Sequence, residues 1–443
     1  MAFMPSGQGA HASPPPAGDA RFALVIGHNG SDDPNLEALR YADDDALRYH
    51  ELLSAVTERA VVLTEADPES RALLEERLDT LELRAPTRQN LLAALDTLRT
   101  AMHAARLRGE RPVLYFVYSG HGNYDAEGRG YLHLADGRFT TRDLFARVLE
   151  PNREDHVILI IDACNAGLMV NGRGRPAEVT AERRPAGVSR LDLSHFPNTG
   201  VILAHSAVGE THEWGRFLAG IFSHEVRSGL YGAADLDDDQ RIDFAELAAF
   251  VASANARVTN PTVRVTPYIR PPLTAPELAV IDLGRARLRG RLRIDHVVGK
   301  AHVVDQDLVR YADFHRTEAS PPFWLALTRP GELVLSTERE AWAIPQEAHG
   351  ELNLTMLAKR SKSTLSARGP GSEYFERTLF HEPFDLTFAR RYLADDYLAD
   401  LELARVVERP WWQNTPAWAT LGGGLVALGG GLALHLTAQD LEA

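Results

Sequence analysis

The chain has 443 residues, of which 44% are hydrophobic and 24% are charged, so it can hold two or three domains with apolar cores of their own. This composition excludes collagen-like, coiled-coil and wholly disordered proteins. The formal net charge of −14 makes a nucleic-acid partner unexpected, because contacts to phosphate need clustered Lys and Arg side chains.

The N-terminal half has the pattern of one α/β domain. Residues 1–20 are rich in Pro, Gly, Ala and Ser, lack the apolar stretch of an export signal, and are expected to form a disordered arm. Residues 21–265 alternate short apolar runs with amphipathic stretches, which predicts a mostly parallel sheet with helices on both faces. The runs expected to form strands are 21–27, 60–63, 113–118, 156–162 and 200–205.

The pattern changes in the second half of the chain. Residues 285–345 alternate apolar and polar side chains around a turn signal at 329–331, which predicts a small β-rich module. Such a module would serve as a spacer or as a binding module. Residues 346–410 follow as a mixed connecting region without a clear pattern.

The C-terminal segment, residues 411–438, has no charged side chain and enough apolar ones to span a bilayer, which takes about 20 residues. Its tryptophans suit a membrane interface, and small residues spaced by four would let two such helices self-associate. Basic residues before the segment and acidic ones after it place the N-terminal bulk of the chain on the cytoplasmic side. The sequence therefore predicts a C-terminal membrane anchor. The alternative is a glycine-rich tail, because six glycines weaken a helix.

Two expected strands end in motifs that carry chemistry. One ends in Tyr-Ser-Gly-His-Gly with His121, and the other in Asp-Ala-Cys-Asn-Ala-Gly with Cys164, the one cysteine of the chain. Catalytic groups collect beyond the carboxyl ends of parallel strands, so neighbouring strands would present the two side chains together. Either residue alone is more typical of a structural role. Together they predict a catalytic dyad that needs no cofactor.

In such a dyad, the thiolate of Cys164 is the nucleophile, because a protonated thiol reacts poorly. The His121 imidazole assists deprotonation or protonates the leaving amine. The backbone N–H groups of Gly122 and Cys164 are expected to bind the developing oxyanion. A lone cysteine cannot make a closed structural zinc site with this histidine, since such a site takes four ligands.

These motifs resemble those of the caspase-like cysteine peptidases, in particular the metacaspase-like and bacterial branch. The resemblance extends to F-A-L-V-I-G at 22–27 and L-R-Y-A-D-D-D-A at 39–46, and covers residues 21–260. It implies a caspase-like fold and a cysteine endopeptidase acting on proteins or peptides. Several branches are zymogens cut in the loop after the catalytic strand. The Arg-rich segment 172–190 occupies that place and is a candidate for self-cleavage.

The resemblance also bears on the substrate. Asp162 replaces the glutamine of animal caspases, and the metacaspase-like branch uses this acidic residue in its primary specificity pocket. By the same match, Ser119 and one of Asp43, Asp44 and Asp45, most simply Asp45, join the pocket. A carboxylate there pairs with guanidinium and rejects acidic side chains, so cleavage after Arg or Lys is expected. The alternative is that Asp162 caps its loop and the aspartate run is a solvated helix face.

A second acidic motif spans residues 235–246 and has the ligand spacing of an EF-hand calcium loop. The expected ligands are the side chains of Asp235, Asp237, Asp239, Asp243 and Glu246 and the carbonyl of Arg241. The motif departs from the pattern at Gln240, where the loop normally needs glycine. An acidic helix-capping turn is the alternative.

The sequence therefore predicts a membrane-tethered, caspase-like cysteine endopeptidase that cleaves after Arg or Lys and processes itself. Two other functions stay open. The chain would be a catalytically silent adaptor if it only recruits partners through the fold. It would be a calcium-responsive regulatory module if calcium binding is its main role.

Overall fold

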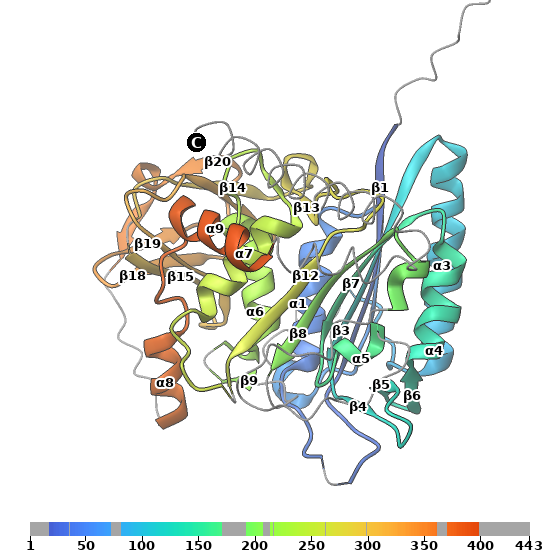
Figure 1. Cartoon of the computed structure of the whole chain (residues 1–443). Helices are drawn as coiled ribbons and strands as arrows, with labels where there is room; N and C mark the ends of the chain where they lie inside the picture. The colour runs from blue at the N-terminus through green and yellow to red at the C-terminus, as the bar shows by residue number, and fades with distance from the viewer. Residues whose placement is uncertain are drawn as a thin grey trace, which may run out of the picture.

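The computed structural model describes residues 17–34, 36–71, 81–170, 192–206, 213–215, 217–261, 263–297, 299–360 and 370–397. A six-stranded sheet in the order β12-β8-β7-β3-β1-β2 forms its centre (Figure 1). Five strands are parallel, and β12 pairs antiparallel with β8 at one edge. The strands are β1 (Ala17–His28), β2 (Arg59–Leu63), β3 (Glu110–Gly120), β7 (His156–Asp162), β8 (Thr199–Ser206) and β12 (Val265–Arg270).

Helices cover both faces of this sheet because the apolar strands are buried on both sides. Alternate residues of β1 enter two different cores: Phe22 and Leu24 pack on the α3 side, and Ala23 and Val25 pack on the α1 side (Figure 1). The α/β prediction is confirmed. The helices are α1 (Ala42–Ser54), α3 (Arg88–Leu107), α4 (Thr141–Leu144), α5 (Gly167–Val170), α6 (Ile221–Ser228) and α7 (Phe244–Asn255).

Two small sheets lie between the main elements. They are β4 (Gly122–Tyr124) with β5 (Gly130–Leu134) and β6 (Gly137–Thr140), and the hairpin of β9 (Glu213–Trp214) and β10 (Ala219–Gly220). The first begins directly after His121, and the second precedes α6. The first sheet therefore continues directly from the histidine motif, and the second leads into α6.

A β-rich part follows, which we call the β-module and define as residues 290–360. Its sheets are β17-β14-β20 and β16-β15-β18-β19-β21, and β11 (Arg241–Ile242) pairs with β13 (Ile281–Asp282) before it. Helices α8 (Pro370–Thr378) and α9 (Leu386–Tyr392) come after it. The strands are β14 (Gly290–Ile294), β15 (Gly299–Asp305), β16 (Arg310–Arg316), β17 (Phe323–Leu327), β18 (Leu333–Thr337), β19 (Ala341–Ile344), β20 (Gly350–Asn353) and β21 (Ala358–Arg360).

The β-module shares a hydrophobic core with the helices on the α1 side of the central sheet. Tyr231, just after α6, stacks on Tyr311 of β16 with ring centroids 4.1 Å apart. The Glu51 carboxylate on α1 pairs with Arg329, which also pairs with Asp305 of β15. The β-module and the α/β part are thus packed as one body rather than joined by a linker.

The expected membrane anchor needs correction. No helix in the described part of the chain has the length and apolar character to cross a membrane. The C-terminal anchor, and with it the membrane localisation with a cytoplasmic catalytic domain, is therefore unsupported, as is self-association through that helix. Residues 411–438 lie outside the described residues. The prediction gives the apolar length of this segment more weight than its six glycines, each of which costs a helix about 1 kcal/mol relative to alanine.

Candidate active site

The motifs that carry His121 and Cys164 lie at the same edge of the central sheet. Strands β3 and β7 are parallel neighbours, and Ser119 pairs with Asp162 at their carboxyl ends (Figure 1). His121 and Cys164 each follow two residues after this pair. His121 and Cys164 are equally far along the chain from the paired residues Ser119 and Asp162, so the two loops emerge side by side. The sequence predicts this arrangement for neighbouring strands.

The loops that follow the two strands touch through their backbones. A Cβ atom placed on Gly122 would lie 2.3 Å from the Cys164 carbonyl oxygen, closer than any side chain tolerates. Glycine is therefore required for the histidine loop to approach the cysteine loop. The chain turns sharply after Cys164, where Asn165 adopts a left-handed conformation with φ of 57° and α5 begins two residues later.

His121 is held in one tautomer. Its side chain is 7% exposed, and its Nε2 donates a hydrogen bond to the Glu37 carbonyl oxygen at 2.9 Å. Because Nε2 carries the proton, Nδ1 is left as the acceptor that a general base needs. Burial lowers the pKa of His121 below its usual 6.5, against the opposing effect of the Glu37 carbonyl. The imidazole is thus neutral at pH 7.

Two further contacts hold the backbone of the histidine loop. The hydroxyl of Tyr118 lies 2.9 Å from the His121 carbonyl oxygen and 2.8 Å from that of His133 on β5. The His133 backbone N–H also donates to the His121 carbonyl at 3.1 Å. These contacts tie the loop to the small sheet that follows it.

The residues assigned to the specificity pocket lie together. Gly220, the last residue of β10 and the N-cap of α6, is the point where they meet: a Cβ there would lie 2.8 Å from Asp162 Oδ2 and 2.9 Å from Asp45 Oδ2. The Gly220 N–H donates to Asp45 Oδ2 at 2.9 Å, and the Ser119 hydroxyl donates to the same oxygen at 3.3 Å. Asp162, Ser119 and Asp45 therefore form one cluster beside the cysteine loop.

Helix α6 supplies two residues to this cluster that sequence reasoning missed. Ser223 donates to Asp162 Oδ2 from its backbone N–H at 3.0 Å and from its hydroxyl at 2.6 Å. The Arg227 guanidinium pairs with Asp45 Oδ1 at 2.8 Å and lies over the Tyr49 ring. No motif marks either residue. All residues of α6 are buried, although several of them are polar. This combination points to a functional role for the helix, but it is visible only in the structure.

The two pocket carboxylates differ in electrostatics. Burial and, to a smaller extent, the neighbouring Asp45 raise the pKa of Asp162 to about 7, against the hydrogen bonds from Ser223 and the charge of Arg227. Burial also raises the pKa of Asp45, but Arg227 pairs with it directly. Among the residues that the structure describes, no ion pair reaches Asp162. In this cluster, the charge of Asp45 is therefore balanced by Arg227, and the charge of Asp162 is not balanced by an ion pair among the described residues.

The rest of the aspartate run is buried as well. Asp43 accepts hydrogen bonds from Asn29 Nδ2 at 2.8 Å and from the Asp67 N–H at 2.9 Å. Asp44 pairs with Arg48 at 3.6 Å. All three aspartates are less than 5% exposed, so the alternative of a solvated helix face is wrong.

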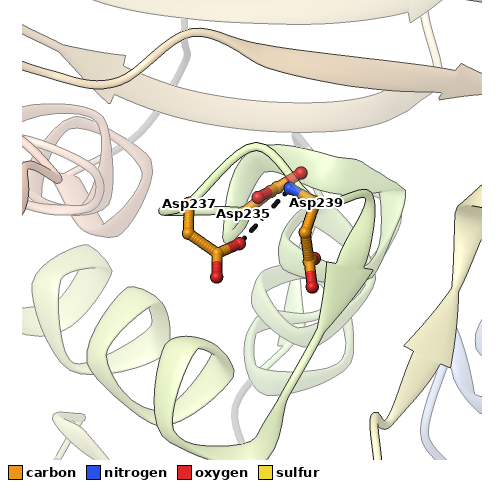
Figure 2. A group of neighbouring side chains, drawn as sticks. All are labelled: Asp235, Asp237 and Asp239. Carbon is orange, nitrogen blue, oxygen red and sulfur yellow. Dashed lines mark hydrogen bonds between the residues drawn. The ribbon is translucent and has the colours of Figure 1, made fainter.

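The acidic loop brings three of its six expected ligands together. Figure 2 shows Asp235, Asp237 and Asp239, whose carboxylate oxygens include a set lying within 4.8 Å of one another. Gln240 adopts the left-handed conformation, with φ of 64°, at the position where an EF-hand has glycine.

The other three expected ligands take part in helix capping or strand pairing. Asp243 is the N-cap of α7 and forms a capping box with Glu246, whose carboxylate also accepts from the Leu236 N–H at 2.9 Å. Arg241 lies in the short strand β11. Burial raises the pKa of Asp235 to about 6 and that of Glu246 to about 8. The C-terminal half of the motif thus matches the helix-capping alternative.

Comparison with known proteins gives one family. The family model described as "Caspase domain" matches residues 20–257, more than half of the chain. No curated protein matches. Similar solved structures include a protein from Geobacter sulfurreducens, with 16% identity, a TM-score of 0.34 and coverage of 56% of this chain and 92% of that one.

Two further solved structures are caspase-1 from Spodoptera frugiperda and its pro form. The first has 11% identity, a TM-score of 0.34 and coverage of 58% of this chain and 87% of that one. The second has 12% identity, a TM-score of 0.34 and coverage of 61% and 94%. These scores are too low to carry an argument, so the family assignment depends on the domain match.

Proposed function

Since the chain belongs to the caspase-domain family, we propose that it is a cysteine endopeptidase that cleaves proteins after arginine or lysine. The family supports cysteine-peptidase chemistry in general. The preference for a basic residue depends on one observation: the Asp162 and Asp45 carboxylates converge on Gly220, and Asp162 lies two residues before Cys164 in the chain. Among the residues that the structure describes, Asp45 has a cation as its ion-pair partner and Asp162 has none.

In the proposed mechanism, the Cys164 thiol gives its proton to Nδ1 of His121 and the sulfur attacks the scissile carbonyl. The Glu37 carbonyl keeps the proton of His121 on Nε2, so Nδ1 is available as the base. The N–H groups of Gly122 and Cys164 bind the oxyanion. The imidazolium then protonates the leaving amine, and water releases the acyl group. None of these steps requires a cofactor.

The pocket would select its substrate by charge. The Asp45–Arg227 pair is neutral as a unit, so Asp162 is the carboxylate left to bind an incoming guanidinium or ammonium group. A peptide library varied at the acyl-side residue tests this directly. Cleavage confined to Arg and Lys is expected, and cleavage after Asp would contradict the proposal.

The pH dependence of binding follows from Asp162. Its pKa is raised to about 7, so the carboxyl is mostly neutral at pH 6 and mostly ionised at pH 8. We expect the KM of an Arg peptide to fall about tenfold between these pH values, because the ionised form binds the cation. The Asp162→Asn variant has no titrating group at this position. Its KM should stay flat, and a flat KM in the wild type would contradict the assignment.

Self-processing is expected in the Arg-rich segment 172–190, which lies outside the described residues and follows α5. Incubated wild-type protein should be cut after an arginine there, and mass spectrometry of the new termini would locate the site. The Cys164→Ala variant should remain intact. Mixing the two proteins shows whether the cut occurs between molecules. Absence of a Cys164-dependent cut in this segment would rule out a self-processed zymogen.

We propose calcium responsiveness as a second candidate function, favoured by the three convergent carboxylates and by the left-handed Gln240. Titration calorimetry should give a dissociation constant of about 10⁻⁵ to 10⁻³ M, the range of weak calcium loops. The Asp237→Asn variant should lose this binding. Glu277→Gln, an exposed acid outside the loop, should retain it. If calcium binds to both variants with the same heat, the loop is not the binding site and acts only as a helix-capping turn.

A further inference from the structure

Helix α6 lies between the pocket and the β-module and contacts both. Ser223 and Arg227, four residues apart on one face, bind the pocket carboxylates. Their chain neighbours His224 and Ser228, also four residues apart, contact β16 of the β-module. Residues four apart share a face of a helix, so α6 presents one polar pair to each side.

Asp313 is the centre of the contact on the β-module side. Its Oδ2 accepts a hydrogen bond from His224 Nε2 at 2.9 Å, its Oδ1 accepts one from Arg310 at 2.8 Å, and its backbone N–H donates to Ser228 Oγ at 3.1 Å. Burial lowers the pKa of His224 to about 4, so its imidazole is neutral and Nε2 carries the proton. Burial would raise the pKa of Asp313, but Arg310 and His224 hold it well below its usual value.

His224 in turn supports the loop that leads into the pocket. Its ring stacks on Phe217, with centroids 3.9 Å apart and an interplanar angle of 28°. The carbonyls of Phe217 and Leu218 accept hydrogen bonds from Arg48, and Leu218 has a left-handed φ of 49°. Gly220, two residues on, is the residue on which the pocket carboxylates converge.

From these contacts we propose that Asp313 of the β-module is a positioning residue for the substrate pocket. It holds the His224 ring under Phe217, and through α6 it sets Ser223 and Arg227 against Asp162 and Asp45. The β-module is then a structural part of the specificity site rather than a spacer. The inference rests on the proposed specificity for Arg and Lys.

The test compares Asp313→Asn with a matched control, Asp305→Asn. Both changes remove the charge of a buried aspartate of the β-module that pairs with a buried arginine. Arg329, the partner of Asp305, forms its other ion pair with Glu51 on α1. Asp305 therefore has the same kind of contact as Asp313 but is linked to α1 and not to α6. With a fluorogenic Arg peptide amide, Asp313→Asn should raise KM about tenfold with little change in kcat. Asp305→Asn should leave KM unchanged.

Two further measurements separate a change in the substrate pocket from damage to the catalytic loops or loss of the fold. The rate at which iodoacetamide alkylates Cys164 should be the same in all variants, which shows that the catalytic loops are intact. If Asp313→Asn does not fold, His224→Phe keeps the ring on Phe217 but removes the hydrogen bond to Asp313, and it should raise KM by a similar factor.

The two proposals fail in different ways. A wild-type protein that does not cleave after Arg or Lys contradicts the proposed function. A wild type that does, with equal KM values for Asp313→Asn and Asp305→Asn or with an unchanged KM for His224→Phe, overturns the positioning role alone.

Discussion

Replacing Cys164 by alanine is expected to abolish peptide cleavage, lowering kcat by about five orders of magnitude. The thiolate is the nucleophile in the proposed mechanism, and removing the nucleophile of a catalytic dyad leaves only the contribution of binding and oxyanion stabilisation. The side chain is small and partly exposed, so the melting temperature should change little. Steady-state cleavage of an Arg peptide, followed together with thermal unfolding, separates loss of catalysis from loss of fold.

The same chain offers a control that distinguishes an enzyme from a silent adaptor. Cys164 is the one cysteine, so a thiol-reactive peptide probe can label the protein at a single position. Labelling of the wild type that is competed by an Arg peptide supports the enzyme. A folded wild type that neither reacts with the probe nor cleaves peptides would favour the adaptor. Full activity in Cys164→Ala would remove Cys164 from the mechanism.

The Asp162→Asn substitution is expected to have the second large effect, on the cleavage of Arg peptides. We expect kcat/KM for Arg peptides to fall about a thousandfold, because the amide keeps the shape of the carboxyl but cannot pair with a guanidinium in a buried pocket. Cleavage after uncharged residues should not fall to the same extent. Kinetics on Arg, Lys and Gln peptides give the measurement.

Glu225→Gln is the matched control for this change. Glu225 lies on α6 next to the pocket, is fully buried and accepts a hydrogen bond from Asn255. Burial raises its pKa well above its usual value, which favours the neutral carboxyl, and the glutamine of the variant can still accept the hydrogen bond from Asn255. Specificity should be unchanged in this variant. A retained Arg preference in Asp162→Asn would place the specificity elsewhere.

Local sequence patterns predict the central sheet and the proximity of the loops that carry His121 and Cys164. The apolar runs identified five strands of the central sheet, and the motifs lie directly at the ends of β3 and β7. Strand β12 escaped prediction because it is an antiparallel edge strand with Pro267 inside it, and neither feature resembles a buried parallel strand.

The features of the site that the sequence does not predict are contacts between distant parts of the chain. Arg227 meets Asp45 across 182 residues, and His224 meets Asp313 across 89, and no spacing rule covers such pairs. The membrane anchor is predicted from the apolar length, tryptophans and small-residue spacing of residues 411–438, which are local features of the sequence. The Asp43–Asp45 run was hard to interpret for a related reason, since a charged run is solvated in most helices and is buried in α1.

The backbone contact between Gly232 and the β-module limits how this protein can be divided or recombined. A Cβ on Gly232 would lie 2.1 Å from the Trp324 carbonyl oxygen, and the residue has a φ of 117° that only glycine adopts with ease. A fragment ending before β14 would expose the apolar surface under this contact to water. The β-module therefore cannot be exchanged as an independent cassette, and a substitution at this contact must preserve its fit against the α/β part.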